Sequence, residues 1–248
     1  MAAPELASTA QPSVPAPGRG NPSVLFVLFG ILAAIVASLV VGLSAAQALV
    51  LLGIPDPGAL TTYGLPAVRA VSEVATVITI GSLFFAAFLV PPQRSGVLDV
   101  GGYRAVRTAG IAAVVWAATA ALMVPLTLSD TSGASFAEAL RPDNLFGALG
   151  QVETALAWAW TTVLALITAL LIRLAVRWSW VPYLLLLSLV TLMPVALTGH
   201  SSSGGSHDLA TNSLVLHLVA ASVWAGGLFA LLAHSWRGGD HTDVAARR

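Results

Sequence analysis

Six long apolar segments constrain the fold of this chain more than any other feature. Each is long enough to cross a hydrocarbon core, which takes about 20 helical residues. A backbone in lipid must also satisfy its own polar groups, which favours helices. The sequence therefore predicts an all-α polytopic membrane helix bundle with about six transmembrane helices, at about 23–53, 67–91, 105–128, 148–174, 181–199 and 209–233.

The composition supports this class and excludes several functions. Only 9% of the residues are charged and 57% are hydrophobic, whereas soluble domains carry about 25% charged residues. The formal net charge of zero gives no basis for binding nucleic acid. Because the chain has no cysteine, a metal site would have to use histidine, methionine, carboxylate or backbone oxygen.

Three regions are expected along the chain. Residues 1–22 are rich in Pro and Ala and are typical of a disordered tail. The transmembrane domain is expected at 23–235, and a cytoplasmic polar tail at 236–248. The tripeptide Ala46-Gln47-Ala48 resembles a signal-peptide cleavage site, but the apolar segment before it is much longer than the about 7–15 residues of a signal core, so we expect a helix that is kept.

The placement of arginine predicts the orientation. Arginines concentrate in the N-terminal tail, the second and fourth loops and the C-terminal tail. Under the positive-inside rule both termini are therefore expected in the cytoplasm. The loop between the fifth and sixth helices, which holds His200 and His207, would then face outward.

Three histidines close together, His200, His207 and His217, are the strongest candidates for chemistry. Burying an unpaired polar group in or beside hydrocarbon costs several kcal/mol in free energy. Such a cluster at one membrane face predicts a metal or haem site. His217 lies inside the sixth apolar segment, and the alternative for it is a neutral imidazole hydrogen-bonded to a neighbouring helix.

Two further residues extend this candidate site. Met193 and His200 are seven residues apart and fall on nearly the same helical face, and a thioether with an imidazole suits Cu(I) or Cu(II). Asp208 can orient His207 or act as a ligand itself. The alternatives are that Met193 fills the core and that Asp208 caps the sixth helix. Pro194 is expected to bend the fifth helix.

Two acidic residues fall inside apolar segments. Glu73 is expected about two turns into the second helix, near the outer face, with Arg69 one turn earlier and available for an ion pair. Glu153 is expected to begin the fourth helix. Both could draw cations toward the histidines, and acidic residues in the outer loops favour a cationic solute. The alternative for Glu73 is a purely structural pair with Arg69.

Catalytic and nucleotide-binding motifs are absent from the sequence. There is no Walker motif, no GxSxG and no HExxH. The sequence therefore predicts a protein that is not an enzyme and does not itself encode an ATP-driven pump.

The string TGHSSSGGSHD, followed by HLVAASVWAGGL, resembles the copper resistance protein D (CopD) family. In particular it is similar to the actinobacterial form in which a CopD region precedes a CtaG-like cytochrome c oxidase assembly region. Further similarity lies in 68–92, 114–130 and 192–200. The resemblance covers about residues 20–235.

The resemblance implies a copper-handling protein of the bacterial plasma membrane that moves copper inward, for resistance or for oxidase assembly. It implies His200, His207 and His217 as metal ligands, with Trp224, Gly226 and Gly227 as packing residues. Expected partners are a copper ion, the lipid bilayer and either a periplasmic copper-binding protein or a CtaG-like domain. Since the family normally has further helices after this motif, we expect a truncated version or the N-terminal part of a longer protein.

Three functional readings remain open at this point. The first is copper permeation past His200, His207 and Met193, and then past His217, along a cavity between the fifth and sixth helices and the second or fourth. The second is a haem-binding redox protein with axial histidines. The third is an oxidase-assembly scaffold that does not transport copper.

Overall fold

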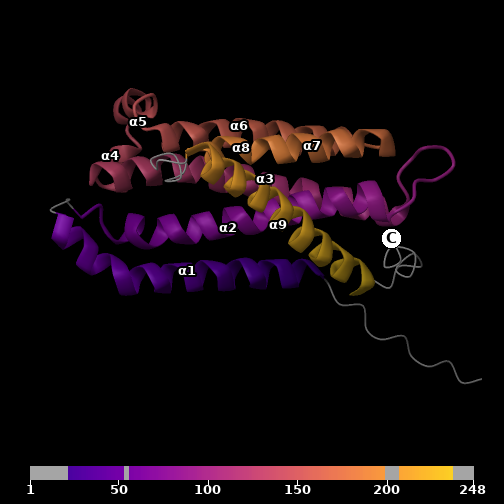
Figure 1. The fold of residues 1–248 in the computed structure, drawn as a ribbon, viewed down its shortest axis with the longest axis horizontal. Coiled ribbons are helices and arrows are strands. Elements are labelled where there is room, and N and C mark those ends of the chain that lie inside the picture. The colour runs from indigo at the N-terminus through magenta and orange to yellow at the C-terminus, as the bar shows by residue number, and fades with distance from the viewer. Residues whose placement is uncertain (1–21, 53–55, 199–206, 237–248) are drawn as a thin grey trace, which may run out of the picture.

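The six expected transmembrane helices are confirmed by the computed structural model, which describes residues 22–52, 56–198 and 207–236. The long helices run antiparallel to their neighbours in the chain (Figure 1). No strand occurs in these ranges apart from a single bridge between Val97 and Arg177. The long helices are α1 (Pro22–Leu52), α2 (Ala59–Phe84), α3 (Val100–Ser132), α6 (Glu153–Leu174), α7 (Val181–Thr191) with α8 (Met193–Leu197), and α9 (His207–Trp236).

Shorter elements join these helices. α2 continues into the π-helix η1 (Phe85–Leu89), and the 3-10 turn η2 (Trp178–Trp180) leads into α7. Two short helices, α4 (Phe136–Ala139) and α5 (Pro142–Leu149), connect α3 to α6 at one end of the bundle (Figure 1). Ser135 caps α4 through a capping box with Glu138, which satisfies the exposed backbone donors of this short helix.

Four of the sequence-based helix boundaries were wrong by four residues or more: the start of α2, both ends of α3 and the start of α6. α2 begins at Ala59, not near 67, and carries Pro66 inside the helix. α3 runs from Val100 to Ser132, not 105–128, and carries Pro125 inside the helix as the expected segment did. α6 begins at Glu153, not near 148. In an apolar environment the remaining backbone groups are best satisfied by continuing the helix, so a single proline does not end it. Pro194, in contrast, does interrupt the fifth span as expected, because α7 ends at Thr191 and α8 starts at Met193.

The core lies where α2, α3 and α6 pack together, and small residues make the close contact possible. Buried alanines follow one face of α3, and others face them from α6, notably Ala165 and Ala169. Small residues let helix backbones approach closely in a membrane. α1 lies at the edge of this core, and its large apolar side chains, such as Leu39 and Val40, are mostly exposed.

α9 crosses α2 (Figure 1), and two glycines, Gly81 of α2 and Gly226 of α9, are in contact at this crossing. A Cβ atom built on Gly81 would overlap the backbone of Gly226, and one built on Gly226 would lie 2.8 Å from the Cα of Gly81. Close approach through Gly226 and Gly227 was expected from the sequence and is confirmed, since a Cβ on Gly227 would meet Phe84 at 3.3 Å. Beyond the crossing, Phe229 contacts Phe29 of α1, with ring centroids 5.2 Å apart.

The two ends of the bundle differ in charge. The end that carries α4 and α5 is termed the acidic end, and the opposite end, where η1 turns into α3 and α6 into η2, is termed the arginine-rich end. One arginine, Arg141, lies at the acidic end. The acidic end holds Asp56, Asp130, Glu138, Asp143 and Glu153, and the arginine-rich end holds Arg94, Arg104, Arg107, Arg173 and Arg177.

Candidate functional site

A cavity of about 320 Å³ lies between α2, α3, α6, the α7–α8 break and α9, and it is open to the outside of the bundle where Arg69 and Glu73 lie. Its apolar walls include Trp116 and Trp158, both almost fully buried. Its polar lining consists mainly of hydroxyl groups, which come from Ser72, Thr76, Thr161, Thr191 and Ser222. A cavity between the fifth and sixth helices and the second and fourth was expected from the sequence.

The interruption of the fifth span shapes one wall of this cavity. Pro194 cannot donate a backbone hydrogen bond, so the helix breaks at Leu192 between α7 and α8. The residues on both sides of the break face the cavity, namely Thr191, Leu192, Val195 and Ala196.

Two of the hydroxyl groups are already committed to their own helices. The Thr76 hydroxyl donates to the carbonyl of Ser72 at 2.8 Å, and the Thr191 hydroxyl donates to the carbonyl of Leu187 at 2.8 Å. Each uses its only hydrogen in this bond, so each oxygen can take part in a further hydrogen bond only as an acceptor.

Thr161, in contrast, has a side-chain hydroxyl group without a hydrogen-bond partner. Its residue is only 2% exposed, and its Oγ1 is the one buried side-chain polar atom in the described part of the chain without a hydrogen-bond partner. Thr168, two turns along the same helix, donates to the carbonyl of Leu164 at 2.8 Å. Buried polar groups are nearly always hydrogen-bonded, so Thr161 is an exception among the described residues.

An ion pair lies beside the same cavity. Arg69 Nε donates to Glu73 Oε1 at 3.2 Å, which confirms the i,i+4 pair expected from the sequence. Glu73 is deeper than expected: it lies near the midpoint of the 31-residue span Ala59–Leu89, because α2 begins two turns earlier than predicted. The side chains are 56% and 67% exposed, respectively.

The histidine cluster falls largely outside the described residues. His200 lies in the segment 199–206, which is outside the described residues. His207 and Asp208 form the start of α9, but only their backbone is described. Met193 begins α8 and is half-buried. The expected shared face of Met193 and His200 therefore also lies outside the described residues.

His217 is described and faces away from the cavity. Its side chain is exposed, whereas α9 presents a different face to the cavity, made of Leu214, Leu218, Ala221, Ser222 and Ala225. Trp224, expected to be a packing residue, is 76% exposed, so that interpretation is wrong within this chain. In the described ranges no three histidine or acidic side chains gather into a metal-binding group.

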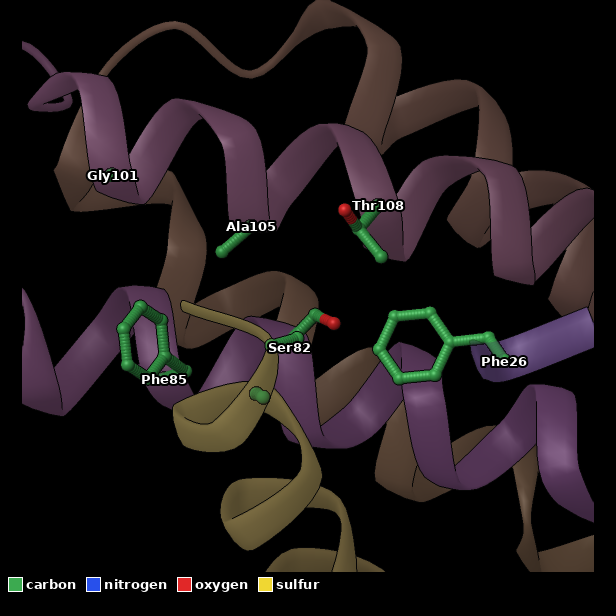
Figure 2. A pocket seen from close by; sticks show the side chains of 8 residues that line it. Phe26, Ser82, Phe85, Gly101, Ala105 and Thr108 are labelled. Carbon is green, nitrogen blue, oxygen red and sulfur yellow. The ribbon is translucent and has the colours of Figure 1, made fainter. Parts of the chain in front are cut away.

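Two other hollows are less suited to a ligand. Figure 2 shows a pocket of about 20 Å³ between α1, α2, α3 and α9, with Ser82 and Thr108 on opposite sides of it. A single water molecule fills this volume. A wider hollow of about 580 Å³ lies at the acidic end between α3, α4 and α5, and Asp143 is its only charged lining residue.

Sequence reasoning named Arg69 and Glu73 but missed the hydroxyl groups. A signal was present, since Ser72 and Thr76 are one helical turn apart and flank Glu73 in an apolar segment. No such signal was present in the sequence for Thr161 and Thr191. Threonine is common in helices, where its hydroxyl can hydrogen-bond to a backbone carbonyl of the same helix.

Fold and site together define a polytopic helical membrane protein with an ion pair and several hydroxyl groups beside a largely apolar cavity in its bundle. The sequence profile of the copper resistance protein D-like N-terminal domain matches residues 59–208. The chain therefore belongs to this family of copper resistance membrane proteins, which is not known for enzymatic activity, and is a multi-pass protein of the plasma membrane.

Relatives of the chain are mycobacterial. An uncharacterized protein of Mycobacterium leprae (strain TN) is 28% identical over 174 residues, which make up 70% of this chain and 26% of the relative. Uncharacterized proteins of Mycobacterium bovis and Mycobacterium tuberculosis are each 26% identical over 219 residues, 88% of this chain and 33% of the relative. The chain thus spans between a quarter and a third of the length of these relatives. No solved structure matches it.

Proposed function

We propose that this protein moves copper inward across the plasma membrane, for copper resistance or for cytochrome oxidase assembly. The observation that carries the proposal is a cavity at mid-bundle with the Arg69–Glu73 pair in its lining, in a member of a copper resistance family. A protein that only packs against a partner has no need of a charged pair beside a cavity within its bundle, since charged groups cost free energy when they leave water.

The charge distribution supports the proposed direction. The arginine-rich end is the cytoplasmic end under the positive-inside rule, which leaves the acidic end outside. Acidic side chains at a rim raise the local concentration of cations. Copper would therefore be attracted where α4, α5 and the start of α9 lie.

Copper ligands are proposed at the outer end of α9. His200 and His207, with Met193 and Asp208, would receive the ion, since imidazole and thioether are suited to Cu(I) and Cu(II). His217 would be a separate contact, because ten residues of α9 separate it from His207 by about 15 Å along the helix axis. A periplasmic copper-binding protein or a CtaG-like domain is the proposed exchange partner.

Copper uptake into proteoliposomes tests the proposal. We expect His200→Ala and His207→Ala each to abolish most uptake at unchanged protein level, while His241→Ala, in the C-terminal tail, leaves uptake intact. Uptake should also decline as the outside pH falls below about 6.5, since protonated imidazole cannot bind a metal. Normal uptake by both outer variants would refute the histidine site.

Metal analysis of the purified protein separates the other functions. Copper bound in the wild type and lost in a His200→Ala/His207→Ala variant supports the transport site. A Soret absorbance band with iron would instead identify a haem protein. An absence of both metals after loading would favour a scaffold role in oxidase assembly.

A further inference from the structure

An apolar groove of about 490 Å³ lies between α1, α2 and α3. α2 lies between the other two helices (Figure 1) and forms the floor of the groove, because α1 packs along α2 and scarcely touches α3 in the described residues. The rim is open, since Ile31 of α1 is 51% exposed and Ile111 of α3 is 63% exposed. The groove therefore faces the surrounding lipid.

The groove is about as deep as one leaflet of the bilayer. On α1 its lining runs from Phe26 to Ile35, which is about 14 Å along the helix axis. The hydrocarbon of one leaflet is about 15 Å deep, half of the whole core. Toward the acidic end α1 closes onto α2, where the Ser38 hydroxyl donates to the carbonyl of Tyr63 at 3.1 Å. A further transmembrane helix would need a groove through both leaflets, whereas an acyl chain fits this length.

A glycine widens the groove near its centre. Gly30 of α1 is buried, yet a Cβ atom built on it would meet nothing within 4 Å. The lining also contains three small residues, Ala34 of α1, Ala75 of α2 and Ala112 of α3. Protein interiors have few voids larger than a water molecule, so an apolar hollow of this size that opens to lipid is filled by hydrocarbon.

Two arginines of α3 lie beside the groove, at the arginine-rich end. Arg104 precedes the lining residue Thr108 by one turn, and Arg107 precedes the lining residue Ile111 by one turn. Residues four apart lie one above the other on a helix, so both arginines continue the stripe of α3 that lines the groove. Both side chains are exposed, and neither guanidinium group has a hydrogen-bond or ion-pair partner in the ranges that the structure describes.

An apolar groove that ends at unpaired arginines complements an acidic phospholipid. The guanidinium group binds phosphate oxygens through a planar fork of N–H donors. Basic pockets between transmembrane helices on the cytoplasmic side bind anionic headgroups, and the arginine-rich end is cytoplasmic under the positive-inside rule. Asp99, the acidic residue of the described chain at this end, accepts from the N–H of Gly101 as the cap of α3.

We propose that the groove binds one anionic phospholipid of the cytoplasmic leaflet, with an acyl chain between α1 and α3 and the phosphate at Arg104 and Arg107. The bound chain fills the space that α1 leaves against α3, and so stabilises the position of α1 on the bundle. The lipid site does not depend on the proposed copper function.

Native mass spectrometry of the purified protein tests the headgroup. The protein in detergent is titrated with phosphatidylglycerol or with phosphatidylcholine of the same acyl chains. We expect one phosphatidylglycerol to bind about tenfold more tightly than phosphatidylcholine, and Arg104→Gln/Arg107→Gln to remove most of that difference, since each arginine near an anionic headgroup contributes to binding. Arg173→Gln/Arg177→Gln is the matched control, because it changes the charge of the same end equally at two exposed residues outside the groove.

A second pair of variants tests the acyl chain. Gly30→Phe places a ring in the groove, where a Cβ atom has free space. Val36→Phe places the same ring at a 50% exposed position of α1 outside the groove lining. Gly30→Phe should weaken phosphatidylglycerol binding about fivefold or more, since buried CH₂ groups contribute to lipid binding, and Val36→Phe should leave it unchanged. If Gly30→Phe does not elute as a folded protein, Gly30→Leu is compared with Val36→Leu.

Three results would overturn the proposal. Equal affinity for the two lipids, or an equal loss in the two arginine double variants, would mean that no anionic headgroup binds at Arg104 and Arg107. Unchanged binding by the Gly30 variant would place the acyl chain elsewhere. A dimer in the same spectra that the Gly30 variant abolishes would mean that a second copy of the chain covers the groove. Because no copper is present, each result is independent of whether the protein transports copper.

Discussion

Gly81 of α2 and Gly226 of α9 are in direct backbone contact, with no room for a side chain on either residue. The contact brings α9 across α2 next to the cavity, on the side of the arginine-rich end, since the cavity lining on α9 ends at Ala225. The glycine pair thus sets the distance between the two helices that form the cavity walls.

The first prediction concerns this crossing. Gly226→Leu should destabilise the protein by about 1–3 kcal/mol or more, because the inserted side chain has to displace the backbone of α2. Thermal unfolding in detergent measures the effect. Gly30→Ala in α1 is the control, since a Cβ there meets nothing within 4 Å. Equal stability of the two variants would show that α9 does not cross at this pair.

The second prediction concerns whether the Arg69–Glu73 pair faces water or hydrocarbon, which the effect of a substitution on the free energy of unfolding distinguishes. If the pair faces water, Glu73→Gln should change the free energy of unfolding in nanodiscs by less than about 1 kcal/mol, as for exposed ion pairs. If it faces hydrocarbon, an unpaired arginine at mid-membrane should cost about 2.5–3.5 kcal/mol. We expect the smaller value, and the larger one would contradict hydration of the pair.

The third prediction concerns a hydrogen bond between α2 and α3 near the acidic end. The Ser129 hydroxyl donates to the Ala134 carbonyl, so the fully buried Thr61 hydroxyl is the donor to Ser129 Oγ, at 2.7 Å. Thr61→Val should cost about 0.6 kcal/mol and at most about 1.7, the range of such bonds between membrane helices. Thr62→Val, whose hydroxyl bonds only its own helix, should cost less in the same unfolding measurement.

The fourth prediction concerns the π-helix η1. Val90 N–H donates to the carbonyl of Phe85, five residues earlier, and the indole N–H of Trp178 donates to the carbonyl of Ala87 at 3.1 Å. Trp178→Phe removes this donor and should lower the free energy of unfolding by about 1 kcal/mol. Trp180→Phe serves as the comparison because Trp180 is 60% exposed; a loss of similar size there would argue against the bond.

Much of the fold could be predicted because a membrane span leaves few alternatives. Apolar length identified all six spans, and the glycines at Gly226 and Gly227 correctly indicated a close helix crossing. The start of α2 could not be predicted, since Pro66 ends helices in water but is tolerated inside this long span.

The candidate site was predicted less completely. The Arg69–Glu73 pair follows from i,i+4 spacing alone and is present. The exposure of His217 and Trp224 could not be read from spacing, because a helix that is apolar all around has no face that marks the core.

The sequence by itself determined that this chain spans a membrane, where its six helices lie, and that an ion pair occurs within α2. These are local properties of hydrophobicity and helical spacing. Only the tertiary structure decided that hydroxyl groups from α2, α6, α7 and α9 meet in one cavity beside that pair, and that Thr161 is left without a partner in it. The physical reason is that these contacts join residues far apart in the chain, and small-residue packing between helices, not local spacing, sets which faces meet.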